Sequence, residues 1–325
     1  MAERRRGEGT KGGRTDMAVL GVAGYALDVP DLDAGIAFYS AAGLVPARSG
    51  DRALLSCPGA PSPCVTLLRA GTRMRLHHVT LRADGLDEMA KLVPPHGGAV
   101  VDAPDGWDAT GLWVSDPHGV LFHLIEGEAA AVEPVGERFV INAPGAIVRV
   151  RRSAMAPMAS YAPARPRKLG HVALFTPDVM VSVAFLTDAF GMGLADRAQD
   201  IVAFCCARQN SDHHVIALAK SPGAGLHHAS FQVADPDEVG RAGQALADKA
   251  GRGHWGFGRH TIGSNFFHYI QDPWGSWFEY YADMDFIDDH ALWEPTVYGM
   301  EDAMANWGPP VPADFVHNYQ AESGQ

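Results

Sequence analysis

Three residues in the second half of the chain have the types of a metal-ligand set: His171, His228 and Glu279. Each stands in a short apolar stretch typical of a β-strand, and side chains alternate between the two faces of a strand. All three can therefore face the same side of a sheet, whereas this alternation turns His227 the other way. Two imidazoles and one carboxylate on one face of an octahedral ion leave three adjacent positions open, as in non-heme Fe(II) sites that bind substrate and O₂ together. Mn(II) would suit the same ligands.

The segments that carry these residues occur twice in the chain. The matching pairs are GVAGYALDVPDLDAGIAFY from Gly21 and KLGHVALFTPDVMVSVAFL from Lys168, RLHHVTLRADGLDEMAKLV from Arg75 and GLHHASFQVADPDEVGRAG from Gly225, and SDPHGVLFHLIE from Ser115 and QDPWGSWFEYYA from Gln271. Three matches in the same order indicate a tandem duplication.

Each copy has the pattern of strand, turn and helix. An alternating apolar stretch such as residues 171–175 is followed by a Pro-Asp turn and then by a helix-period stretch such as residues 181–189. The DPHG and DPWG segments are turn signals that precede a further strand. The pattern therefore predicts an α+β protein made of two repeated modules.

The two copies differ at the metal-ligand positions. The residues of the first copy that correspond to His171, His228 and Glu279 are Gly24, His78 and His123. One ligand is missing there and the carboxylate is replaced, so we expect no catalytic metal in the first half.

Composition shifts along the chain predict its division. We expect a disordered arm over residues 1–16, a non-catalytic domain over 17–145, a linker over 146–167, a catalytic metal-binding domain over 168–285 and a C-terminal segment over 286–325. The last segment is too aromatic for a free tail, so we expect it to pack back over a domain as a possible lid. Its residues Trp293, Tyr298 and Trp307 could line the same pocket as the metal.

Charge and cysteine usage limit the function classes. The 325 residues carry a formal net charge of -12, which disfavours nucleic acid or an anionic membrane as a partner. Four cysteines without CxxC spacing, the lack of an apolar run of spanning length and the lack of a signal-peptide pattern predict a cytoplasmic protein. No phosphate-loop or nucleophile-elbow motif is found in the sequence.

Each candidate ligand also has an ordinary structural explanation. With fifteen histidines in the chain, any single one is more often a hydrogen-bonded core or surface residue. For Glu279, a carboxylate within WFEYY, a buried salt bridge is the alternative to a metal. The repeated pattern, and not the number of histidines, favours the metal site.

The second half resembles the type I extradiol ring-cleaving dioxygenases of the vicinal oxygen chelate superfamily. The resemblance lies in LGHVAL around His171, DHHVIAL around His214, LHHASF around His228, and GRHTIGSNFFHYIQDPWGSWFEYY from Gly258 to Tyr281. It implies paired βαβββ modules folded into open barrels, and it implies His171, His228 and Glu279 as the iron ligands.

The resemblance further implies three catalytic residues. His214 is implied as the general acid and base near O₂, with the neighbouring His213 as the alternative by spacing. His260 and Tyr269 are implied as groups that hydrogen-bond the ring oxygens of the substrate, and alternation makes His268 the outward neighbour. Without the resemblance, we would take His214 for a surface strand residue and Tyr269 for a core aromatic residue.

The implied reaction is cleavage of a catechol-type ring adjacent to the diol, with Fe(II) and O₂, to a muconic semialdehyde-type acid. The implied partners are the catechol, O₂ and further copies of the chain in a homo-oligomer. Relatives that act on carboxylate-bearing catechols have an arginine where this chain has Trp255, which favours an uncharged ring substituent, although Arg259 is nearby.

Two other functional hypotheses compete with the dioxygenase interpretation. A glyoxalase-like isomerase, or another metalloenzyme of the superfamily, usually builds its site from ligands spread across modules, which Gly24 and His123 disfavour. A metal-free small-molecule-binding protein of the drug-sequestering kind is disfavoured by the three-ligand face together with His214, His260 and Tyr269.

Overall fold

The computed structural model describes residues 17–129, 132, 142, 145–149, 151 and 163–321. The arm predicted over residues 1–16, and most of the linker predicted over residues 146–167, lie outside the described residues. In the described part of the chain, no helix is long and apolar enough to cross a membrane.

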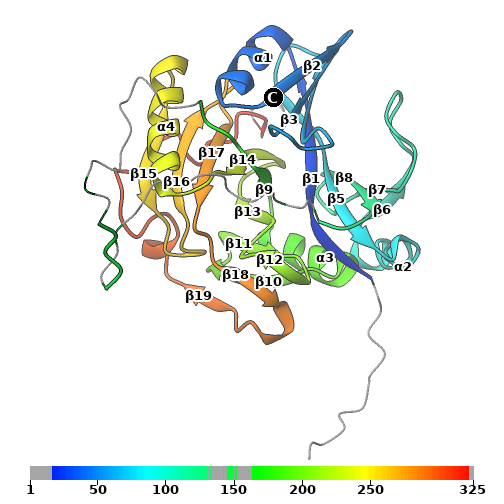
Figure 1. Ribbon diagram of the computed structural model, residues 1–325. Coiled ribbons are helices and arrows are strands. Elements are labelled where there is room, and N and C mark those ends of the chain that lie inside the picture. Colours follow the sequence, from blue (N-terminus) through cyan, green and yellow to red (C-terminus); the bar gives the residue numbers. More distant parts are fainter. Residues whose placement is uncertain are drawn as a thin grey trace, which may run out of the picture.

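The first module forms one sheet in the order β2-β3-β4-β1-β5-β8-β7-β6 (Figure 1). Its elements are β1 (Ala18–Val29), α1 (Leu32–Ala41), β2 (Val45–Ser49), β3 (Arg52–Ser56), β4 (Val65–Arg69), β5 (Arg75–Asp84), α2 (Leu86–Leu92), η1 (Pro94–His96), β6 (Ala99–Val101), β7 (Leu112–Ser115) and β8 (Leu121–Glu126).

The second module forms a sheet in the order β15-β16-β17-β14-β9-β13-β11-β10-β19, in which β19 (Thr296–Tyr298) comes from the C-terminal segment. Its elements are β9 (Lys168–Thr176), α3 (Val179–Phe190), β10 (Gly193–Ala198), β11 (Val202–Cys206), β12 (Gln209–Asp212), β13 (Ile216–Lys220), β14 (Gly225–Gln232), α4 (Pro236–Ala250), β15 (His254–Arg259), β16 (Phe266–Gln271) and β17 (Trp277–Ala282). The α+β class and the strand-turn-helix units predicted from the repeats are confirmed.

The Pro-Asp turns begin a helix in both modules. The side chain of Asp31 accepts hydrogen bonds from the first free backbone N–H groups of α1, and Asp178 does the same for α3. An aspartate at this position satisfies donors that have no partner inside the helix. This local requirement explains why the Pro-Asp pair occurs at the same place in both copies.

Strand pairing supports the internal duplication at the level of single residues. In the second module, Ser230 pairs with His171 on one side and with Glu279 on the other. In the first module, Thr80 pairs in the same way with Gly24 and His123. The three positions matched by sequence are therefore matched in register.

The two modules share one hydrophobic core. The ring of Phe278, on β17, lies 6.0 Å from the ring of Phe38 and 6.2 Å from that of Tyr39, both on α1. The hydroxyl of Tyr280 donates a 2.8 Å hydrogen bond to the carbonyl of Ala42. The first module thus supports the strand that carries Glu279.

The C-terminal segment packs on the second module. It contains β18 (Phe286–Asp289), η3 (His290–Leu292), β19 (Thr296–Tyr298) and η4 (Met300–Asp302). Strand β18 pairs with β12, and β19 extends the large sheet beside β10 (Figure 1). The segment therefore packs back over this domain, as its aromatic composition predicts.

Candidate metal centre and cavity

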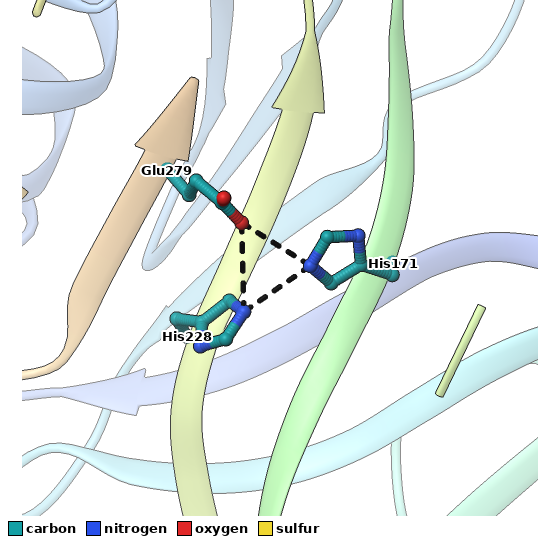
Figure 2. Close-up of side chains that lie close together, drawn as sticks. All are labelled: His171, His228 and Glu279. Atoms are coloured by element: carbon teal, nitrogen blue, oxygen red, sulfur yellow. Dashed lines mark hydrogen bonds and ion pairs between the residues drawn. The ribbon is translucent and has the colours of Figure 1, made fainter. Parts of the chain in front are cut away.

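His171, His228 and Glu279 converge from three neighbouring strands, β9, β14 and β17, as Figure 2 shows. The Nε2 atoms of His171 and His228 are 3.2 Å apart, and the Oε2 atom of Glu279 lies 3.2 Å from the first and 3.6 Å from the second. All three side chains are buried. Three potential ligand atoms within 4.8 Å of one another form a group that can hold a metal ion.

The charges at this group suit a cation. Burial alone would raise the pKa of Glu279, but its polar interactions with the neighbouring imidazoles of His171, His260 and His228 outweigh burial and hold this pKa well below its usual value. Burial lowers the pKa of His228 well below its usual value, so its imidazole is neutral and can act as a ligand. The buried Oε2 atom of Glu279 has the imidazole nitrogens of His171 and His228 beside it, at 3.2 and 3.6 Å, but no well-aligned hydrogen-bond donor. A divalent cation bound here would satisfy that oxygen, so the residues fit a metal.

His227 lies at the same cavity as His228, so the expectation that it points the other way was wrong. The pairing of β14 with β9 slips between Leu226 and His228, and His227 is the extra residue of a β-bulge. Its Nδ1 atom lies 2.7 Å from the Nδ1 atom of His228, and its ring contacts Phe315. The first module has the same bulge at His77, so both LHH motifs interrupt the alternation.

His214, and not His213, faces the metal group. Its ring centroid lies 4.2 Å from that of His171, and it lines the cavity. Burial and the neighbouring histidines lower the pKa of His214 well below its usual value. His213 points away from the cavity and its Nε2 atom lies 2.8 Å from the Oδ2 atom of Asp196. The structure thereby separates the two alternatives that spacing left open.

His260 and Tyr269 meet on the other side of the group. The Nε2 atom of His260 lies 2.9 Å from the hydroxyl oxygen of Tyr269, and the Nδ1 atom of His260 contacts the carbonyl of Met304. Burial and the charge of Glu279 raise the pKa of Tyr269 well above its usual value. His268 lies on the opposite face against Gly243 of α4, as alternation predicts.

A cavity of about 650 Å³, including its open mouth, adjoins these groups. Its other walls are mostly apolar, and no lysine or arginine is among the described residues that line it. Representative wall residues are Phe204, Ala217 and Ala219 from the sheet and Met304, Phe315 and Val316 from the C-terminal segment. The C-terminal segment thus forms part of the cavity wall.

The wall residues of the C-terminal segment are not the ones expected. Trp293 packs against His213, and Trp307 packs against Phe257 and Phe266, so neither reaches the cavity. Tyr298 lies on β19, beside β10, and is not among the lining residues either. These aromatic residues anchor the C-terminal segment to the sheet. The part of the segment that lines the cavity lies near Met304 and Phe315.

Trp255 and Arg259 also lie outside the cavity wall. Trp255 is buried under Tyr269 and Phe315. The guanidinium group of Arg259 lies over the ring of Phe266 and contacts Asp283. Neither residue brings charge to the cavity.

Sequence reasoning missed Asn265, which donates a 3.2 Å hydrogen bond from Nδ2 to the Oε1 atom of Glu279. Asn265 stands just before β16 and Glu279 lies on β17, and nothing in the sequence marks Asn265 as a partner of the carboxylate. In the first module, aromatic rings fill the place that corresponds to the metal-ligand group of the second. The ring of Trp113 stacks on that of His123 at 4.3 Å, and Trp107 contacts His78. Within the described residues, that module presents no three-ligand group.

The chain is similar to proteins of known family and structure. The model of the Glyoxalase/Bleomycin resistance protein/Dioxygenase superfamily matches residues 168–280. Metapyrocatechase 2 of Cupriavidus necator is 37% identical over 310 residues, which cover 94% of this chain and 93% of that protein. The Mn(II)-bound glyoxalase of Novosphingobium aromaticivorans has a similar structure, with a TM-score of 0.72, 26% identity and coverage of 91% of this chain and 95% of that one. An extradiol ring-cleaving dioxygenase of B. fuscum shares the fold, with a TM-score of 0.72, 20% identity and coverage of 95% and 84%.

Proposed function

The chain belongs to the extradiol dioxygenases of the glyoxalase/bleomycin resistance protein/dioxygenase superfamily, and on that basis we propose that it cleaves a catechol-type ring adjacent to the diol, with O₂ and a divalent metal. The observation that carries the proposal is the convergence of His171, His228 and Glu279 beside an open cavity. The product would be a muconic semialdehyde-type acid.

His171, His228 and Glu279 would hold the metal, and Fe(II) is the proposed ion, with Mn(II) as the alternative that the same ligands allow. When bound, the cation would favour the ionised diol and bring both reactants to one centre. Buried Glu279 contributes a fixed negative charge, and Asn265 orients it through Oε1. These ligands come from rigid neighbouring strands, which keeps them in place before the metal arrives.

The remaining polar residues would orient the substrate and move its protons. His260 and Tyr269, already hydrogen-bonded to each other, lie where they can hydrogen-bond a ring oxygen. His214 lies beside His171 with a neutral imidazole, which can take a proton from the reacting centre and later return it.

The walls favour a catechol with an uncharged substituent. No lysine or arginine among the described lining residues is available to pair with a carboxylate. Small side chains at Ala217 and Ala219 leave room on the sheet side, while Met304 and Phe315 provide apolar contacts from the C-terminal segment.

An activity assay tests the proposal. The metal-free protein is loaded anaerobically with Fe(II) or Mn(II), exposed to O₂ and offered catechol, alkylcatechols and carboxylated catechols. We expect O₂ uptake matched by a yellow ring-fission product, with the alkylcatechols preferred over carboxylated ones. A metal-loaded protein that consumes no O₂ with any catechol would refute the proposal. Isomerisation of a glutathione-type substrate without O₂ would favour the glyoxalase-like alternative.

A further inference from the structure

A buried carboxylate and imidazole lie directly behind His214. His213 is fully buried and Asp196, on β10, is nearly so. The Oδ2 atom of Asp196 lies 2.8 Å from the Nε2 atom of His213, whose Nδ1 atom lies 3.1 Å from the Nδ1 atom of His214. The three side chains form a continuous hydrogen-bonded row that ends at the cavity.

The carboxylate sets the proton order of the row when His213 is neutral. A carboxylate can only accept, so the Nε2 atom of His213 carries the hydrogen of that bond. In neutral His213 the Nδ1 atom is then bare and accepts the hydrogen on the Nδ1 atom of His214. This order leaves the Nε2 atom of His214 without a hydrogen, as a base.

The C-terminal segment holds the carboxylate in place. The backbone N–H of Thr296, at the start of β19, donates a 2.6 Å hydrogen bond to the Oδ1 atom of Asp196. The indole of Trp293 donates to the carbonyl of Ala195, and the edge of its ring lies against His213. The backbone N–H of His213 donates to the carbonyl of Asp285 at 2.7 Å. Both oxygens of Asp196 are thereby committed, and the His213 ring cannot turn freely.

We propose that Asp196 and His213 are positioning residues that set the tautomer of His214, so that its Nε2 atom is the proton acceptor at the reacting centre. This inference deepens the proposed function and rests on it for the role of His214. Neither residue touches the substrate. Their effect is exerted through hydrogen bonds that fix the tautomer and orientation of one imidazole, in the way that a buried aspartate fixes the catalytic histidine of hydrolytic triads.

Nuclear magnetic resonance of the metal-free full chain, labelled with ¹⁵N-histidine, tests the tautomer directly. Two-bond ¹H–¹⁵N couplings distinguish a hydrogen on Nδ1 from one on Nε2, and His214→Phe identifies the signals. We expect the Nδ1–H form of His214 in the unaltered protein. The Nε2–H form there would overturn the proposal, and this measurement needs no variant in the row.

Asp196→Asn gives the second test. An amide nitrogen facing His213 donates instead of accepting, which reverses the row and places the hydrogen of His214 on Nε2. We expect that reversal in the spectrum, a fall in kcat of about 10²-fold or more, and an unchanged KM and metal content. An unchanged His214 tautomer in Asp196→Asn would also overturn the proposal.

Asp200→Asn is the matched control. Asp200 is exposed at the turn after β10, where it pairs with Arg197, so we expect it to retain both the tautomer and kcat. The two proposals fail separately. An unaltered protein that shows the Nδ1–H form of His214 but cleaves no catechol refutes the proposed function alone, whereas an unaltered protein that cleaves catechol with the Nε2–H form refutes this inference alone.

Discussion

Replacement of Glu279 by glutamine tests the metal site most directly. Glutamine has the shape of glutamate, so Glu279→Gln keeps a polar group beside Asn265, but it removes the negative charge and turns one carboxylate oxygen into an NH₂ donor. An ion held between the three ligand atoms, which lie within 4.8 Å of one another, is within about 4 Å of that charge. At an effective dielectric constant of about 20, two unit charges at this distance attract by about 4 kcal/mol.

That attraction corresponds to about 10³-fold in the dissociation constant of the metal. The assay is anaerobic titration of the metal-free protein with Fe(II) or Mn(II), followed by calorimetry. Glu126→Gln is the control, because Glu126 is exposed at the end of β8 in the first module. A Glu279→Gln protein that binds the ion as tightly as the unaltered protein would refute the assignment of this carboxylate as a ligand.

Three further predictions concern catalysis, stability and specificity. His214→Phe should retain the metal and bind catechol yet turn over at least about tenfold more slowly; equal turnover in a steady-state assay would exclude a general acid or base role. Burial raises the pKa of Asp272 to about 7, so the folded state binds more protons than the unfolded state between about pH 4 and 7, and stability falls as pH rises through that window. Asp272→Asn should not show this loss, so its free energy of unfolding should rise by at least about 1 kcal/mol relative to that of the unaltered protein as pH increases from about 5 to 7. Parallel pH profiles of urea unfolding for the two proteins would contradict this. Ala217→Leu should raise KM about tenfold for alkylcatechols with little change for catechol, and an equal rise for both substrates would disprove a wall contact with the substituent.

Most of what could be predicted about the fold came from the internal repeats of the sequence. Because each copy repeats its strands in the same order, the matches of His171 with Gly24 and of Glu279 with His123 could be read from the sequence, and strand register agrees with them. The ligand group could be predicted because a strand fixes which side chains share a face.

Other features depend on contacts that no local pattern encodes. The bulge at His227 breaks the alternation on which its direction was predicted. The choice between His213 and His214 depends on Asp196, seventeen residues away on another strand. The cavity residues of the C-terminal segment depend on where β19 docks, so the most aromatic positions, such as Trp293, serve as anchors instead of as walls.

The core that joins the two modules has a consequence for the second module on its own. Phe278 faces Phe38 and Tyr39, so a catalytic half produced alone would expose a ring cluster to water directly behind the strand of Glu279. We expect such a fragment to aggregate or to lose its ligand geometry. The first module, which presents no three-ligand group among its described residues, therefore serves the site as a scaffold for the strand of Glu279.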